Sequence, residues 1–297
     1  MGAKLRVVRR RIRSVQSTMK ITRAMELIAT SRIMRAQQRV EQGRPYAELL
    51  TQAMEDVARQ TGSLVHPLLE DRDDPRRGGM LVITSDRGLA GAYNTNVLRR
   101  AEDVLGGIRQ RGLEPVVYVV GKKGQSYFRF RGVPVERAWT GVSEVPTLEA
   151  AREIGGEIIE AFRERRIDEL HAAYTDFRSM FTLRATDRRF LPIAPEELAG
   201  EALGAPHPEY LFEPEPAAIL DDLLPAYIVT KVFAAMLESA ASENAARRRA
   251  MKAATENAEE LIKVLTREAN QARQTEITTE IMEIVGGAEA LQQASGE

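Results

Sequence analysis

The chain has 297 residues and a formal net charge of −1; 29% of its residues are charged, 5% are aromatic and none is cysteine. This composition excludes a disulfide framework, a thiolate metal site and a cysteine nucleophile. No segment approaches the roughly 18 apolar residues that a membrane-spanning helix needs. No secretory signal is visible, so the sequence predicts a protein kept in the cytoplasm.

The first predicted element is a long helix at residues 1–60. Its apolar residues recur at alternating intervals of three and four: Leu5, Val8, Ile12, Val15 and Met19. That spacing is typical of a helix that packs along a second helix. No proline precedes Pro45, and no glycine lies between Gly2 and Gly43. We therefore expect a bend near Gly43 and Pro45, with helix continuing beyond it.

The start of this helix is strongly basic. Residues 1–35 contain ten lysines and arginines and a single acid, Glu26. Such a bias favours binding to either an acidic protein surface or a nucleic acid. Residues 1–35 contain no aromatic residue that could stack on bases, and no known DNA-binding motif is present.

A linker at 61–78 precedes a central α/β domain at 79–208. The domain alternates short β-branched runs with helix-like stretches, and the runs predicted as strands are Met80–Thr84, Val116–Val120, Ile167–Phe177 and Phe181–Phe190. This alternation predicts a mostly parallel, Rossmann-like sheet. Neither glycine-containing turn, Ser85–Gly91 or Gly121–Gly124, has the spacing of a phosphate-binding loop. A nucleotide-using enzyme built on this domain is thus a weaker alternative.

The chain ends in a second long helix. We expect a connector with a short helix at 209–224, a helix at 225–287 that begins at Pro225, and a polar tail at 288–297. Between Pro225 and Val285 the sequence has no further proline and no glycine. Ten alanines lie in the stretch from Ala234 to Ala258. The two long helices are predicted to form an antiparallel coiled coil. Its far end would bring the basic first turn beside a set of isoleucines: Ile277, Ile281 and Ile284.

Sites for chemistry are sparse. The three histidines, His66, His171 and His207, are isolated in the sequence, and none has a second ligand at helical spacing. No catalytic residue, metal site or cofactor is therefore expected.

Several motifs make the chain recognisable when they are taken together. They occur in this order: Lys20–Arg32, Arg44–Tyr46, Thr84–Gly91, Tyr210–Pro216, Ala241–Arg247, Met251–Asn257 and Ala272–Thr278. In these motifs, and over nearly its whole length, the chain resembles the gamma subunit of F-type ATP synthases of the bacterial type. A redox-regulatory insert with two cysteines, found in chloroplast-type members, is absent.

The resemblance implies a central rotor that couples proton flow through a c ring to ATP synthesis or hydrolysis. Its implied partners are three alpha and three beta subunits, the epsilon subunit and the c ring, with one copy of this chain in each complex. The implied location is peripheral, at the cytoplasmic face of the cell membrane. The alternative from the residues alone is a coiled-coil scaffold or nucleic-acid-binding protein with a basic N-terminal helix.

The resemblance also implies two sets of contact residues and no catalytic residue. Contacts to the lever and catch loops of the beta subunits are implied for eight positions: Arg23, Met25, Arg32, Arg247, Arg273, Gln274, Thr278 and Glu280. Contacts of the foot to epsilon and the c ring are implied for Tyr210, Phe212 and Glu213.

Overall fold

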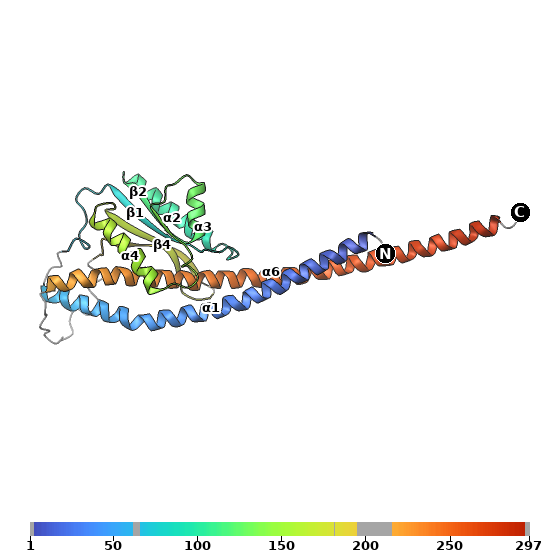
Figure 1. Cartoon of the computed structure of the whole chain (residues 1–297), viewed down its shortest axis with the longest axis horizontal. Helices are drawn as coiled ribbons and strands as arrows, with labels where there is room; N and C mark the ends of the chain where they lie inside the picture. The colour runs from blue at the N-terminus through green and yellow to red at the C-terminus, as the bar shows by residue number, and fades with distance from the viewer. Residues whose placement is uncertain (1–2, 62–65, 181, 195–215, 295–297) are drawn as a thin grey trace. The chain divides into compact units, whose positions relative to one another are not determined.

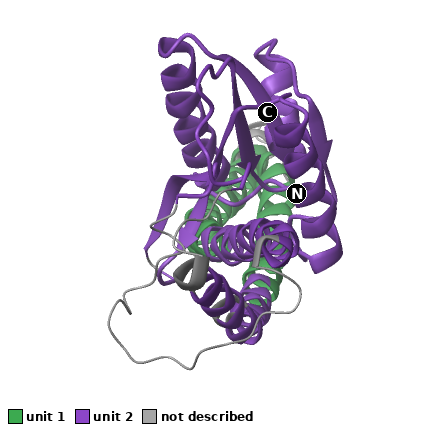
Figure 2. Cartoon of the chain, turned by 90° about the vertical axis from the view of Figure 1, so that its left-hand side faces the viewer, with its two compact units in different colours: residues 1–28, 248–297 green, residues 29–247 purple. Residues whose placement is uncertain are grey.

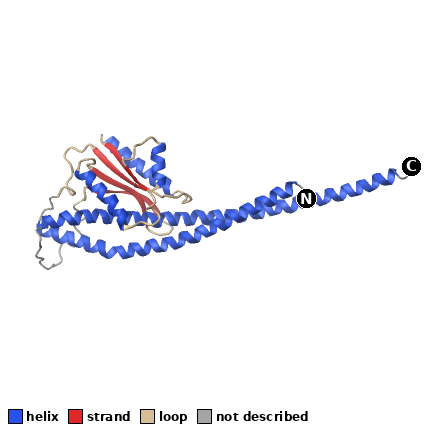
Figure 3. Ribbon diagram, viewed as in Figure 1, coloured by secondary structure: helices blue, strands red, loops and turns tan. Residues whose placement is uncertain are grey.

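The computed structural model describes residues 3–61, 66–180, 182–194 and 216–294. Two long helices, α1 (Ala3–Thr61) and α6 (Pro216–Ala294), begin and end the chain, and an α/β region lies between them in the sequence (Figures 1 and 3). The chain divides into two compact units (Figure 2). One contains residues 1–28 and 248–297, and the other contains residues 29–247.

Neither long helix is interrupted at its internal proline. α1 continues through Pro45, and α6 continues through Pro225. The expectation of a short helix followed by a new one at Pro225 was wrong. Apolar residues on both sides of Pro225 are buried in one core: Leu220, Leu224, Ile228 and Val232. Because these residues recur every four positions, their burial offsets the hydrogen bond that a proline removes from a helix.

In the unit of residues 1–28 and 248–297, α1 and α6 pack antiparallel. Leu5 and Val8 are buried against Leu265 and Ala269. Further along α1, the Thr22 and Thr255 hydroxyls form a buried hydrogen bond of 2.7 Å. Residue numbers rise along one helix as they fall along the other, so the predicted antiparallel pairing is confirmed.

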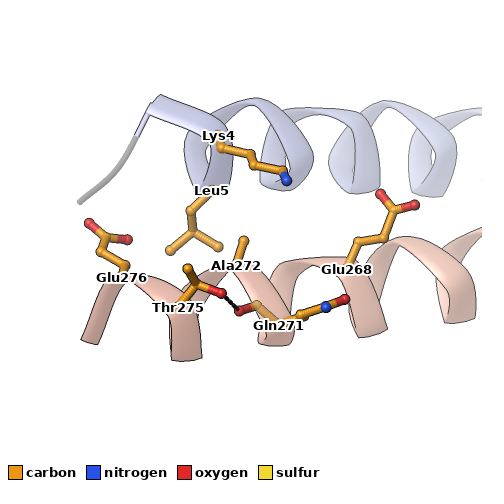
Figure 4. Close-up of a pocket in the computed structure, with 7 residues that line it drawn as sticks. All are labelled: Lys4, Leu5, Glu268, Gln271, Ala272, Thr275 and Glu276. Carbon is orange, nitrogen blue, oxygen red and sulfur yellow. Dashed lines mark hydrogen bonds between the residues drawn. The ribbon is translucent and has the colours of Figure 1, made fainter. Parts of the chain in front are cut away.

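The expected register at the end of this pairing was wrong. Lys4 and Leu5 face α6 across a cavity of about 540 Å³, lined on α6 by Glu268, Gln271, Ala272, Thr275 and Glu276 (Figure 4). Ile277, Ile281 and Ile284 are instead 45%, 54% and 72% exposed. The packing of Leu5 against Leu265 sets this register, and the end of α6 extends past the described start of α1.

The unit of residues 29–247 contains a five-stranded sheet. Its strands are β1 (Arg77–Ile83), β2 (Glu114–Val120), β3 (Arg137–Trp139), β4 (Glu169–Phe177) and β5 (Leu183–Leu191). The strand order is β3-β2-β1-β4-β5, and only β5 runs antiparallel to its neighbour. The four predicted strands are confirmed. β3 was not predicted, because three residues are too few to show a period.

Helices cover both faces of the sheet. On one face, α2 (Tyr93–Gln110) and α3 (Lys122–Phe130) bury apolar side chains against β1 and β2. On the other face, α4 (Leu148–Arg163) packs with residues of α6 and with Leu50, Met54 and Val57 of α1. α4 lies between the sheet and α6 (Figure 1). This contact is close at Gly155, where an added Cβ would lie 2.9 Å from Val229 Cγ2.

Candidate functional site at the carboxyl edge of the sheet

The carboxyl edge of the sheet is where this fold normally binds a ligand. From β1 the chain continues to β2 and β3 on one side of the sheet, and β4 pairs with β1 on the other side. In open parallel sheets, the crevice outside such a reversal point usually holds the ligand. Here the reversal point lies between the ends of β1 and β4, so the groups at these two ends decide whether a site is available.

The loop after β1 is fixed by the carboxylate of Asp86. Its Oδ1 accepts a hydrogen bond from the Lys122 amide at 3.1 Å. Its Oδ2 accepts hydrogen bonds from the Ser143 amide at 3.1 Å and the Ser143 hydroxyl at 2.9 Å. Burial alone would raise the pKa of Asp86, but hydrogen bonds from Gly141, Ser143 and Lys122 outweigh it and lower that pKa. The ionised carboxylate thus holds together the loops that follow β1, β2 and β3.

The first turn of α3, where a phosphate would bind, is occupied by the chain's own atoms. Besides the Lys122 amide on Asp86, the Lys123 amide donates to Ser85 O and the Gly124 amide donates to Thr84 Oγ1. Gly121 has φ +95°, and a Cβ there would lie 2.3 Å from Thr84 O. The glycine therefore permits a close approach of two backbones, and these amides have no capacity left for a nucleotide phosphate.

The crevice itself is filled by α6. At the end of β4, the Ser242 hydroxyl donates to Thr175 O at 3.2 Å. In the loop after β1, the Arg247 guanidinium donates to Gly88 O at 3.2 Å. Between these two points, Ala246 is buried with Ala90 and Tyr93. The chain's own helix thus occupies the position that a substrate or cofactor takes in enzymes with such a sheet.

The segment of α6 in the crevice carries a buried ion pair. Arg247 Nη2 lies 2.6 Å from Glu243 Oε1, and the two side chains are 6% and 1% exposed. Burial raises the pKa of Glu243, Arg247 opposes this shift, and Glu144 and Asp86 add to it. Glu243 Oε2 is also buried and finds no hydrogen-bond partner among the described residues. Such a pair adds little net stability, but loss of either partner would leave the other charge buried and uncompensated.

α1 reaches the same loops through Glu144. Arg32 Nη1 of α1 lies 2.9 Å from Glu144 Oε2, and Arg87 Nε lies 3.2 Å from Glu144 Oε1. Both long helices are thus attached to the carboxyl-edge loops at neighbouring points. We call this set of residues the junction: Arg32, Asp86, Arg87, Gly88, Ser143, Glu144, Glu243 and Arg247.

Comparison with known proteins matches nearly the whole chain to one family. A family model described as ATP synthase matches residues 4–291. The ATP synthase gamma chain of Acidothermus cellulolyticus is 54% identical over 295 residues, which cover 98% of each chain. The ATP synthase gamma chain of Mycolicibacterium smegmatis is 52% identical in an alignment 305 residues long, which covers 98% of this chain and 99% of the other.

The chain belongs to the ATP synthase gamma chain family. Solved structures show the same fold at low identity. A chain of the Euglena gracilis mitochondrial ATP synthase, solved as its OSCP/F1/c-ring part, has a TM-score of 0.68 at 16% identity, over 99% of this chain and 97% of the other. A chain of the Tetrahymena thermophila mitochondrial ATP synthase, from its central stalk and c ring, has a TM-score of 0.57 at 21% identity. The match covers 79% of this chain and 99% of the other.

Residues at positions inferred from the gamma chain family fall into three groups. Arg32 and Arg247 belong to the junction and are internally bonded. Met25 is half-buried, and the other positions on α1 and α6 are exposed: Arg23, Arg273, Gln274, Thr278 and Glu280. Tyr210, Phe212 and Glu213 lie outside the described residues.

Sequence reasoning missed three junction residues, Ser143, Glu144 and Glu243. Glu243 lies four residues before Arg247 in a recognised motif, so the helical spacing alone could have indicated this pair. Ser143 and Glu144 lie in an irregular loop, and nothing in their local sequence indicates contact with Asp86 or Arg32. In the described parts of the chain, no cluster of side chains could hold a metal ion, and no helix is both long and apolar enough to cross a membrane.

Proposed function

We propose that the chain is the rotating shaft of an F-type ATP synthase and performs no catalysis itself. In this role it couples proton flow through a c ring to ATP synthesis or hydrolysis at three beta subunits. The junction carries the proposal, because it fixes the α/β region to both long helices through buried or partly buried polar contacts. An element that transmits torque must resist slippage between its parts, and directional contacts of this kind oppose it.

The geometry at the carboxyl edge also supports a non-catalytic role. α6 occupies the crevice, and the first amides of α3 are bonded internally. An enzyme would need these groups for its ligand. Membership of the gamma chain family likewise favours the rotor over a coiled-coil scaffold or nucleic-acid-binding protein.

The family positions outside the junction are proposed to contact partners. Arg23 and Met25 would meet the acidic lever loop of a beta subunit, and Arg273, Gln274, Thr278 and Glu280 would meet the catch loop. Tyr210, Phe212 and Glu213 would form a foot against epsilon and the c ring. One copy of the chain would sit within three alpha and three beta subunits, held at the cytoplasmic face of the cell membrane through these partners.

The absence of cysteine in the chain allows a direct test. Met25→Cys provides a unique thiol, which can be paired with a cysteine placed in the acidic lever loop of the beta subunit. Oxidation of the assembled complex should form a disulfide between the two subunits and stop ATP hydrolysis, and a reductant should restore it. Full hydrolysis by the cross-linked complex would refute the proposal, because a chain tethered to one beta subunit cannot turn.

A further inference from the structure

The outer face of α3 carries charge that the fold does not use. α3 has nine residues, of which Lys122, Lys123 and Arg129 are basic and none is acidic. None of these three side chains forms an ion pair with any described residue, although Arg131, the next residue after α3, pairs with the carboxylate of Glu102. The positive charge on this helix is therefore not balanced within the described part of the chain.

Two of these cations lie where they weaken the helix. Lys122 and Lys123 occupy the first turn of α3, and the positive end of a helix dipole disfavours cations. Their backbone amides are fixed by Asp86 and Ser85, but their side chains are exposed. Helix stability therefore does not account for these lysines.

An aromatic side chain projects from the same helix. Phe130 is 89% exposed, whereas Phe128, two residues earlier, is fully buried in the core under α3. Phe130 lies four residues after the exposed Ser126 and eight after the exposed Lys122, so the three share one face of the helix, and the exposed Arg129, seven residues after Lys122, borders it. A single exposed apolar residue is ordinary, but one placed among unbalanced cations is typical of an anchor in a protein interface.

We propose that this face of α3 docks an acidic protein surface, with Phe130 inserted in an apolar pocket and Lys122 and Arg129 facing carboxylates. A lipid surface fits less well, since membrane-surface helices present a broad apolar face and α3 presents one apolar residue. A nucleic acid also fits less well, because it needs several stacking aromatics and the neighbouring Tyr127 is half-buried near Arg131. The proposal follows from α3 alone and does not depend on the rotor assignment.

Photo-cross-linking in cells tests the proposal on the full chain. A photoreactive phenylalanine analogue at position 130 should cross-link one protein, and mass spectrometry should locate an acidic segment on it. The control carries the same analogue at Arg152, an exposed position on α4. Cross-linking to lipid or RNA, or to the same products as the control, would overturn the proposal.

Charge reversal provides the second arm. Lys122→Glu with Arg129→Glu should lower the cross-linking yield at position 130 by about tenfold or more, as expected when an electrostatically matched interface is reversed. Both side chains are exposed, so the circular dichroism spectrum should not change. An unchanged yield in a folded double variant would show that the surface does not recognise an anionic partner.

Discussion

Arg247→Ala removes the cation of the buried pair in the junction. Glu243 is 1% exposed and would keep its burial, and Gly88 O would lose the guanidinium donor that lies at 3.2 Å. Breaking a buried ion pair by removing one partner costs about 3–5 kcal/mol. We therefore expect Arg247→Ala to lower the free energy of unfolding by about that amount at pH 8.

The pH dependence of this loss identifies its cause. Burial already raises the pKa of Glu243, and removing Arg247 removes the largest opposing effect. The carboxyl of the variant should therefore take up a proton as the pH falls, which removes the uncompensated charge. The destabilisation should be smaller at pH 5 than at pH 8.

Urea unfolding of the purified full chain, followed by circular dichroism, measures the effect. Lys252→Ala is a matched control, because Lys252 and Glu256 have the same helical spacing but are 62% and 63% exposed. That change should cost less than about 0.5 kcal/mol. Arg247→Met with Glu243→Leu should restore most of the lost stability, because it removes both charges together.

A loss in Arg247→Ala no larger than that in Lys252→Ala would refute the assignment of a buried pair. The same holds if the double variant is as unstable as the single one. Hydrogen exchange would add a local check, because amides near Gly88 and Ser242 should lose protection in Arg247→Ala and keep it in Lys252→Ala.

Three further predictions concern other parts of the chain. Gly155→Ala should lower the free energy of unfolding by about 1–3 kcal/mol, because its Cβ would lie 2.9 Å from Val229 Cγ2; Gly156→Ala, with nothing within 4 Å, should be neutral or stabilising in the same urea titration. Burial, and then the nearby Asp176, raise the pKa of Glu238 from 4.5 to about 7. The stability of the wild type relative to Glu238→Gln should therefore fall as pH rises from 4.5 to 7, by about 1–3 kcal/mol, and a constant difference in urea titrations over this range would contradict the shift. Met25→Lys should reduce the protons pumped per ATP hydrolysed in the reconstituted complex without changing the unfolding midpoint; an equal ratio would reject the proposed contact with an acidic loop.

The long helices and most of the sheet could be predicted from local patterns. The spacing of Leu5, Val8 and Ile12 predicts a packed helix face, and the β-branched runs predict β1 and β2. The register of the helix pair could not be predicted, because many pairings of two such faces bury similar apolar area. The continuation of α6 through Pro225 depends on tertiary burial of Leu224 and Ile228, which a local rule does not contain.

The junction residues were also only partly predictable from local sequence patterns. Arg32 and Arg247 were identified through motifs. Glu243 lies one helical turn before Arg247, whereas the other partners, Glu144 and Gly88, lie far away in the chain. Asp86 appeared in the sequence as part of a tight turn after a strand. Its role became visible only once Lys122 and Ser143 were placed beside it. Contacts between loops more than 30 residues apart leave no period in a single sequence.

Rotation of the chain inside the assembled complex is the most direct test of the account. Arg109→Cys gives one thiol on an exposed position of α2 in a chain that has no other cysteine. A visible probe attached there, with the catalytic subunits fixed to a surface, should turn in one direction when ATP is added. A probe that stays still while the same complexes hydrolyse ATP at the normal rate would contradict the account.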